Sequence, residues 1–295
     1  MRVRTSWALA VAVGAWGASV LSAQSPFVSL SHPAIEYATR ATSDPVAALN
    51  RRIASGEVTL TFDPASGYLR SVLDALTVPV ESQTLVYSPT SLQSIRITQR
   101  NPRALFFNDQ VAVGWVKGTD TLEVSSMDPR QGAIFYQLAQ VREGRPQFTR
   151  TTQCLECHLA EDTSGVPGLL SMSMLPLSDD PNEYAVGWAV DHRTPFADRW
   201  GGWYVTGASV PEVHLGNVPV LHVEKGRQRA ARAPNLASVR DAIDATAYPL
   251  PYSDVVALMV LNHQTRMTNM LTRLNWHARV AEHDRKDVKA LQALA

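Results

Sequence analysis

The chain has 295 residues, of which 45% are hydrophobic, so it is long and apolar enough to bury a substantial core. Its 27 basic residues balance its 27 acidic residues. This neutrality argues against nucleic acid or an anionic surface as the partner.

The N-terminus has the pattern of a secretory signal peptide. Arg2 and Arg4 precede an apolar run over residues 7–21, and small residues follow up to Ala23. The run is shorter than the roughly 20 residues that span a bilayer, and the later apolar stretch 255–261 is shorter still. We therefore predict a signal peptide over residues 1–23, export to the periplasm and no membrane span in the mature chain. Retention of the signal as an anchor is the alternative, because the cleavage site is imperfect.

Helices are predicted first and strands second along the N-terminal half. Leu49 and Ile53, four residues apart, indicate a helix over residues 45–55 that ends at Gly56, and a second helix fits residues 67–76. Short apolar runs separated by turn residues then predict strands. These strands are Thr84–Tyr87, Ile95–Thr98, Val111–Val116, Thr121–Ser125 and Ala133–Gln137.

The motif that carries chemistry is Cys154-Leu155-Glu156-Cys157-His158, which contains both cysteines of the chain. This spacing is the attachment pattern of haem c. Two thiols three residues apart reach the vinyl groups on one porphyrin edge, and the next residue presents an imidazole to the iron. Three alternatives are a plain disulfide, a thioredoxin-like dithiol and a zinc site, which would need a fourth ligand that no paired motif supplies.

A segment rich in glycine, proline and aromatic residues follows over residues 165–219, which we interpret as long loops lying over a flat apolar group. Trp200 and Trp203 offer area for a porphyrin, and Arg193 and Arg199 are candidates to pair with its propionates. The alternative is a structural aromatic corner with solvated arginines.

A last helical section is predicted from residue 253 to about residue 293, and it bears on the second axial ligand. At helical spacing it has an apolar stripe of Val256, Val260, His263, Met267, Met270 and Leu274. His263 is therefore the first candidate for a distal ligand, His214 the second, and Met172 or Met174 the third. A core histidine satisfied by a backbone carbonyl is the alternative for His263. Weaker propionate candidates on this helix are Arg266 and Arg273.

Several segments together resemble a family of uncharacterised bacterial exported haem c proteins. They are Leu105–Val116, the Cys-Leu-Glu-Cys-His motif with Gly165–Gly168, Arg199–Gly207, His214–Pro219 and Tyr252–Arg273. The resemblance implies haem c binding but no activity. The chain departs from small class I cytochromes c, because about 130 mature residues precede its motif, whereas those domains place the motif near their start.

These observations predict an α+β protein, in which a mixed helix and β-rich part, residues 24–150, packs on a mainly helical, loop-rich haem c part, residues 151–295. The two parts are also compatible with a single domain. The favoured function is electron transfer to a redox partner protein by one covalently bound haem c. His158 is then the proximal iron ligand and His263 or His214 the distal ligand. The alternatives are a haem enzyme with an open distal site, such as a peroxidase or small-substrate oxidoreductase, and a haem subunit of a larger redox complex.

Overall fold

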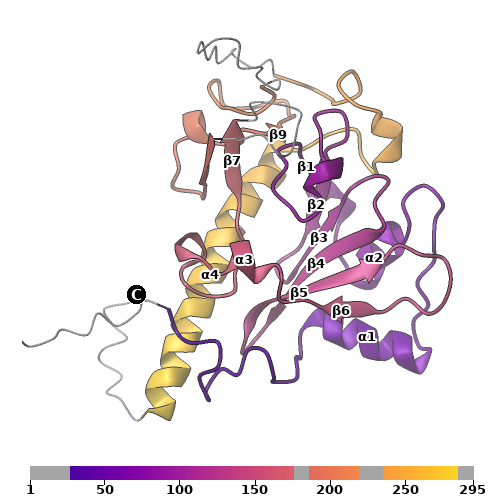
Figure 1. Cartoon of the computed structure of the whole chain (residues 1–295). Helices are drawn as coiled ribbons and strands as arrows, with labels where there is room; N and C mark the ends of the chain where they lie inside the picture. The colour runs from indigo at the N-terminus through magenta and orange to yellow at the C-terminus, as the bar shows by residue number, and fades with distance from the viewer. Residues whose placement is uncertain (1–26, 176–185, 219–234, 285–295) are drawn as a thin grey trace, which may run out of the picture.

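The computed structural model describes residues 27–175, 186–218 and 235–284, and its fold is a mixture of a large antiparallel sheet and a few helices (Figure 1). This mixture confirms the predicted α+β class, but it does not test the predicted haem c part. The predicted signal peptide, residues 1–23, lies outside the described residues.

The centre of the molecule is a seven-stranded sheet with the order β6-β5-β4-β3-β2-β1-β9. Its strands are β1 (Thr84–Val86), β2 (Arg103–Phe107), β3 (Val111–Trp115), β4 (Thr121–Asp128), β5 (Gly132–Ala139), β6 (Phe148–Arg150) and β9 (Trp203–Tyr204). All neighbouring strands are antiparallel. Strands β1 to β6 therefore form a meander in chain order, and β9 adds to the free edge of β1 from the far half of the chain.

The first face of the sheet packs against helices α1 (Pro45–Ser55) and α2 (Leu69–Ala75) (Figure 1). Alternate strand residues such as Val113 and Val124 point into this core together with Leu49 and Leu73. Asp44 starts α1 because its carboxylate accepts bonds from the amides of Val46 at 2.9 Å and Ala47 at 3.1 Å.

The second face is covered by the long helix α4 (Val255–His283) and by the segments around it (Figure 1). A second core joins Phe107 of this face with Trp200, Trp203 and Leu258. Further along α4, Trp276 is fully buried in the first core. The remaining elements on this side are α3 (Leu155–His158) and a two-stranded sheet of β7 (Met172–Leu175) and β8 (Val186–Ala189).

The predicted helix over residues 45–55 has the observed bounds, and four of the five predicted strands overlap observed ones. The exception is Ile95–Thr98, where the chain forms the 3-10 turn η2 (Ser94–Arg96) instead of a strand. Strand β2 was not predicted. The regions 24–150 and 151–295 share the sheet, because β9 pairs with β1, and share the first core through Trp276.

The apolar stripe of α4 does not face the protein core. Val256, Val260, His263 and Leu274 are exposed in the structure. The buried face instead carries several polar residues, including Asn262, Thr265, Asn269 and Thr272. Apolar spacing alone does not identify the buried face of a helix that buries amides and hydroxyls. None of the helices within the described ranges is long and apolar enough to cross a membrane.

Candidate functional site

Helix α3 is a single turn that places both cysteines and His158 on one short segment after β6. Cys154 is half-buried, Cys157 is exposed, and both are free thiols. Burial, and then the nearby Glu123 carboxylate, raise the pKa of the Cys154 thiol to about 11. A thiol with a raised pKa remains protonated at neutral pH, which is the opposite of the activated thiolate of a dithiol oxidoreductase.

His158 is held through one ring nitrogen. Its Nδ1 lies 2.9 Å from the carbonyl oxygen of Gly168, and the Gly168 amide donates back to the His158 carbonyl at 3.0 Å. A carbonyl oxygen only accepts, so Nδ1 carries the ring proton and Nε2 keeps its lone pair. Among the described residues, Nε2 has no hydrogen-bond partner.

The surroundings of His158 keep its ring neutral. Burial lowers the pKa of the imidazole, the bond to the Gly168 carbonyl partly offsets this effect, and the Arg103 charge adds to the lowering. The ring also packs on Phe135 of β5 with 4.9 Å between ring centroids. A neutral imidazole with a free Nε2 and an Nδ1–H bonded to a carbonyl is the form in which histidine binds a metal.

The loop from α3 to Gly168 is fixed by Thr163, which is fully buried. Its hydroxyl accepts from the Ala160 amide at 2.9 Å and lies 2.8 Å from the Val166 carbonyl, to which it donates. Gly165 in this loop has a φ of 73°, a left-handed conformation that suits glycine. The loop therefore presents the Gly168 carbonyl from a defined turn.

A buried ion pair next to the motif was missed by the sequence analysis. Arg103 of β2 and Glu123 of β4 are 2.6 Å apart on the second face of the sheet, with 19% and 11% of their side chains exposed. Their charges act on both Cys154 and His158. The buried Nε of Arg103 has no hydrogen-bond partner in the described structure, so a donor remains available there. The sequence signal that could have revealed this pair is a single charged residue in each of two apolar runs, Arg103 in residues 103–107 and Glu123 in residues 121–128.

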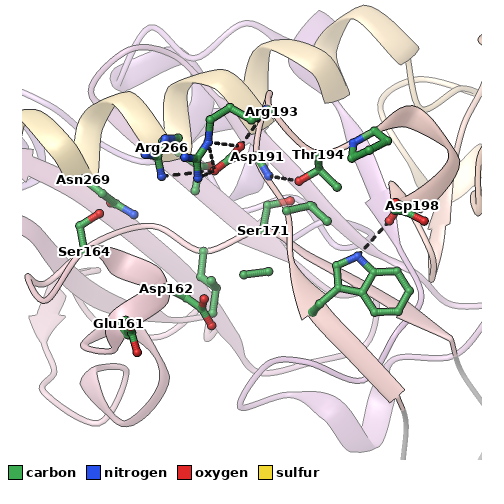
Figure 2. A pocket seen from close by; sticks show the side chains of 16 residues that line it. Glu161, Asp162, Ser164, Ser171, Asp191, Arg193, Thr194, Asp198, Arg266 and Asn269 are labelled. Atoms are coloured by element: carbon green, nitrogen blue, oxygen red, sulfur yellow. Dashed lines mark hydrogen bonds and ion pairs between the residues drawn. The ribbon is translucent and has the colours of Figure 1, made fainter.

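A cavity of about 530 Å³ lies beside this loop (Figure 2). One wall begins shortly after His158 with Glu161 and Ser164, and α4 contributes Arg266. Two predicted propionate candidates meet here around one carboxylate: Asp191 is 2.8 Å from Arg193 and 3.4 Å from Arg266.

Asp191 is strongly acidic in this setting. Burial by itself raises its pKa, but bonds from the side chain and backbone of Arg193, with the charges of Arg193 and Arg266, lower the pKa to about 2. The carboxylate thus remains charged and holds both guanidinium groups at the cavity wall. Cys154, Cys157 and His158 do not line this cavity.

The other predicted haem-contacting residues make structural contacts. Arg199 is buried and donates to the backbone carbonyls of Thr194 at 2.5 Å and His192 at 2.7 Å. Trp200 and Trp203 are both buried in the second core. Their indole N–H groups bond to the Asn262 side chain at 3.0 Å and to the Met172 carbonyl at 2.7 Å.

The candidate distal ligands lie on segments other than α3. The His263 side chain is exposed, and its ring packs on that of His192 with centroids 4.7 Å apart. His214 is half-buried against Trp200, while Met172 and Met174 lie on β7. Within the described ranges, no hydrogen bond or ring contact connects any of these four candidates with His158.

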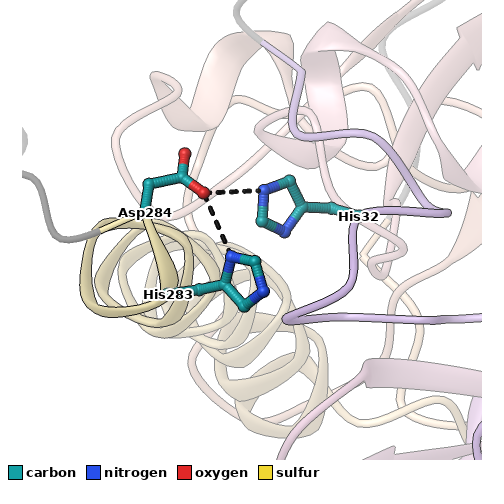
Figure 3. Close-up of side chains that lie close together, drawn as sticks. All are labelled: His32, His283 and Asp284. Carbon is teal, nitrogen blue, oxygen red and sulfur yellow. Dashed lines mark hydrogen bonds and ion pairs between the residues drawn. The ribbon is translucent and has the colours of Figure 1, made fainter.

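A second group of metal-ligating side chains, His32, His283 and Asp284, joins the N-terminal segment to the end of α4 (Figure 3). One Asp284 oxygen lies 3.1 Å from Nδ1 of His283 and 3.5 Å from Nε2 of His32. Nδ1 of His32 accepts from the Ala34 amide at 3.1 Å, so Nε2 carries the ring proton and faces the carboxylate. This tautomer favours a hydrogen-bonded link over a metal site.

Comparison with known proteins assigns no relative to the chain: no family model, no curated protein and no solved structure matches it. The predicted membership of a family of exported haem c proteins is therefore wrong as an assignment.

Proposed function

We propose that the chain binds one haem c through Cys154 and Cys157, with His158 as the proximal iron ligand, and acts in electron transfer after export to the periplasm. The observation that carries this proposal is the state of His158. Its imidazole is neutral, its Nδ1–H is bonded to the Gly168 carbonyl, and Nε2 has no partner among the described residues.

The donor set as a whole fits this group. Each thiol adds across one vinyl group, so that a carbon–sulfur bond forms, the thiol hydrogen moves to the vinyl carbon, and no oxidant is required. Cys154 and Cys157 are both reduced and lie on the same helical turn as His158. When bound, the haem supplies a ferric–ferrous couple. The unpartnered Arg103 Nε is a second candidate donor for a propionate, in addition to Arg193.

Electron transfer fits the exposure of the motif. Glu156 and Cys157 are exposed, so the attached edge of the porphyrin would lie near the surface, where a redox partner protein can approach. The chain must set the potential through the ligands, burial and nearby charges, among which are Arg103 and Glu123, whose charges act on His158. Periplasmic location follows from the predicted signal peptide and suits haem c assembly.

The test is expression of the full chain with the haem c maturation machinery. We expect one haem that remains attached after denaturation of the wild-type protein and is lost in the double variant Cys154→Ala/Cys157→Ala, because one remaining thiol can still form a single thioether bond. His277→Ala, a change at a half-buried α4 histidine with no part in the site, serves as the matched control and should retain the haem. Absence of a covalently retained chromophore in the wild-type protein would refute the proposal.

A haem enzyme with an open distal site is the second candidate, and the observation that favours it is the cavity of about 530 Å³ next to the α3 loop. Sites for small molecules have volumes of this order, about 300–1,000 Å³, with a few fixed polar groups such as Asp191 and Arg266. Spectra with carbon monoxide separate the candidates. A low-spin spectrum that carbon monoxide does not change supports the carrier, and rapid binding supports the enzyme.

A further inference from the structure

Asn269 on α4 holds the backbone next to the His158 partner. This side chain is only 2% exposed. Its Nδ2 donates to the Leu169 carbonyl at 2.7 Å, and its Oδ1 accepts from the Leu169 amide at 2.8 Å. The backbone N–H and C=O of Leu169 are therefore both bonded to the side-chain amide of Asn269. This side chain is buried and belongs to a 29-residue helix.

The contact extends to Gly168, whose carbonyl accepts the His158 Nδ1–H. A Cβ added at Gly168 would lie 2.3 Å from Oδ1 of Asn269, so the Gly168 backbone sits directly against this amide. A continuous chain of contacts thus runs from α4 through Asn269 and the backbone of residues 168 and 169 to the ring of His158.

We propose that Asn269 is a positioning residue for His158: by clamping Leu169 it fixes the Gly168 carbonyl, and so keeps the ring in the Nδ1–H tautomer with Nε2 directed to a ligand position. The control of the tautomer stands on the geometry of the haem-free chain. Its effect on iron rests on the proposed function.

The effect on iron has a definite direction. A carbonyl that accepts from Nδ1–H makes the imidazole a stronger base and favours the ferric state. Outer-shell partners of this kind change metal affinity by about 10–100-fold. If Asn269 is removed and His158 binds ferric iron about tenfold more weakly relative to ferrous iron, the midpoint potential rises by about 59 mV for one electron.

The variant Asn269→Leu keeps the size of the side chain and removes both bonds. Asn262→Leu is the matched control, because Asn262 is also a buried α4 asparagine with two side-chain bonds, to Trp200 at 3.0 Å and Ser171 at 2.9 Å. If Asn269→Leu does not fold, Asn269→Ser replaces it, since a small polar side chain leaves room for water.

Two measurements are made on the full chain. In the haem-free form, long-range ¹H–¹⁵N spectra of histidine-labelled protein report which nitrogen of His158 carries the proton, with His158→Gln for assignment. In the haem-bound form, spectroelectrochemistry gives the midpoint potential. We expect the Nδ1–H tautomer to lose population and the potential to rise in the Asn269 variant, with neither change in Asn262→Leu.

An unchanged tautomer and potential in the Asn269 variant would overturn the inference, as would equal shifts in Asn262→Leu, which would indicate a general loss of stability. If the wild-type chain attaches no haem, the proposed function fails separately, and the tautomer measurement alone decides the role of Asn269.

Discussion

At the scale of single residues, Gly168 is the position where side-chain size matters most for the site. In Gly168→Ala, the new Cβ would lie 2.3 Å from Oδ1 of Asn269 and 3.1 Å from Cβ of Thr163. Overpacking of this kind costs about 1–3 kcal/mol. We expect a loss of about 2 kcal/mol in the free energy of unfolding, measured by urea denaturation of the haem-free chain.

The same change can be tested for its cause by a double-mutant cycle. Asn269→Ala removes the amide that the new methyl group would meet, so Gly168→Ala should cost clearly less in the Asn269→Ala background than in the wild type. Additive effects of the two substitutions would mean that the contact with Asn269 is not the source of the cost.

Asp191 predicts a pH dependence of stability. Its folded pKa of about 2 lies below its ordinary value of 3.8, so the folded chain binds this proton less readily than the unfolded chain does. The stabilisation is fully present above about pH 4 and is lost as the pH falls towards 2. Asp191→Asn should therefore be less stable than wild type at pH 7, and this difference should shrink between pH 4 and pH 2 in urea titrations at fixed ionic strength. A difference that does not vary with pH would contradict this explanation.

The haem c attachment pattern of Cys154, Cys157 and His158 can be identified in the sequence, because all three residues lie within one five-residue motif, and haem attachment itself stays a prediction. The sequence could not predict which nitrogen of His158 is available, since the answer depends on the carbonyl of Gly168 and on Asn269, far along the chain. Trp200 and Trp203 show a limit of the sequence signal: aromatic rings suited to a porphyrin also suit a core, and in the structure both are buried in the second core.

At the scale of elements, the N-cap residues of α1 and α4 differ in the number of groups to which each carboxylate is bonded. Asp44 is fully buried, caps α1, and also accepts from the Tyr136 hydroxyl at 2.7 Å, whereas Asp254 caps only α4. An N-cap contributes about 1 kcal/mol, and a hydrogen bond to a charged group contributes about 1.5–3 kcal/mol. After Asp44→Ala the Tyr136 hydroxyl keeps Thr42 at 3.1 Å as a partner, which limits the second loss. We expect Asp254→Ala to cost about 1 kcal/mol and Asp44→Ala about 2–3 kcal/mol in chemical denaturation. Equal costs would show that the Tyr136 bond adds nothing.

Element prediction succeeded where local signals agree with the packing and failed where they do not. The helix at residues 45–55 has a capping aspartate, a proline at its first position and a glycine after its last, and its bounds were predicted without error. Strand β2 begins with Arg103, whose charge interrupts the apolar pattern. It pairs with β3 over residues 104–107, and Glu123 on the same face neutralises the Arg103 charge.

At the scale of the whole molecule, the chain beyond residue 150 completes the packing of the chain before it. The indole of Trp276 lies against Tyr37 with centroids 6.3 Å apart, and Tyr248 lies against Trp115 at 5.5 Å. Strand β9 supplies the outer neighbour of β1. Sequence alone could not reveal this sharing, because the contacts join residues more than one hundred positions apart.

A fragment of residues 24–150 is therefore expected not to fold by itself. It would lose the buried aromatic rings of Trp276 and Tyr248, and removing one large buried aromatic side chain costs about 3–5 kcal/mol. Two such losses approach the whole stability of a typical domain, about 5–15 kcal/mol. In the fragment the second face of the sheet would also be uncovered, so that Phe107 would be exposed to water. We expect no near-ultraviolet circular dichroism signal, no cooperative urea transition and rapid proteolysis, with the chain of residues 24–295 as the control. A cooperative transition in the fragment would instead make residues 24–150 an independent domain, and the contacts with Trp276 and β9 would then be a docking interface between two folded parts.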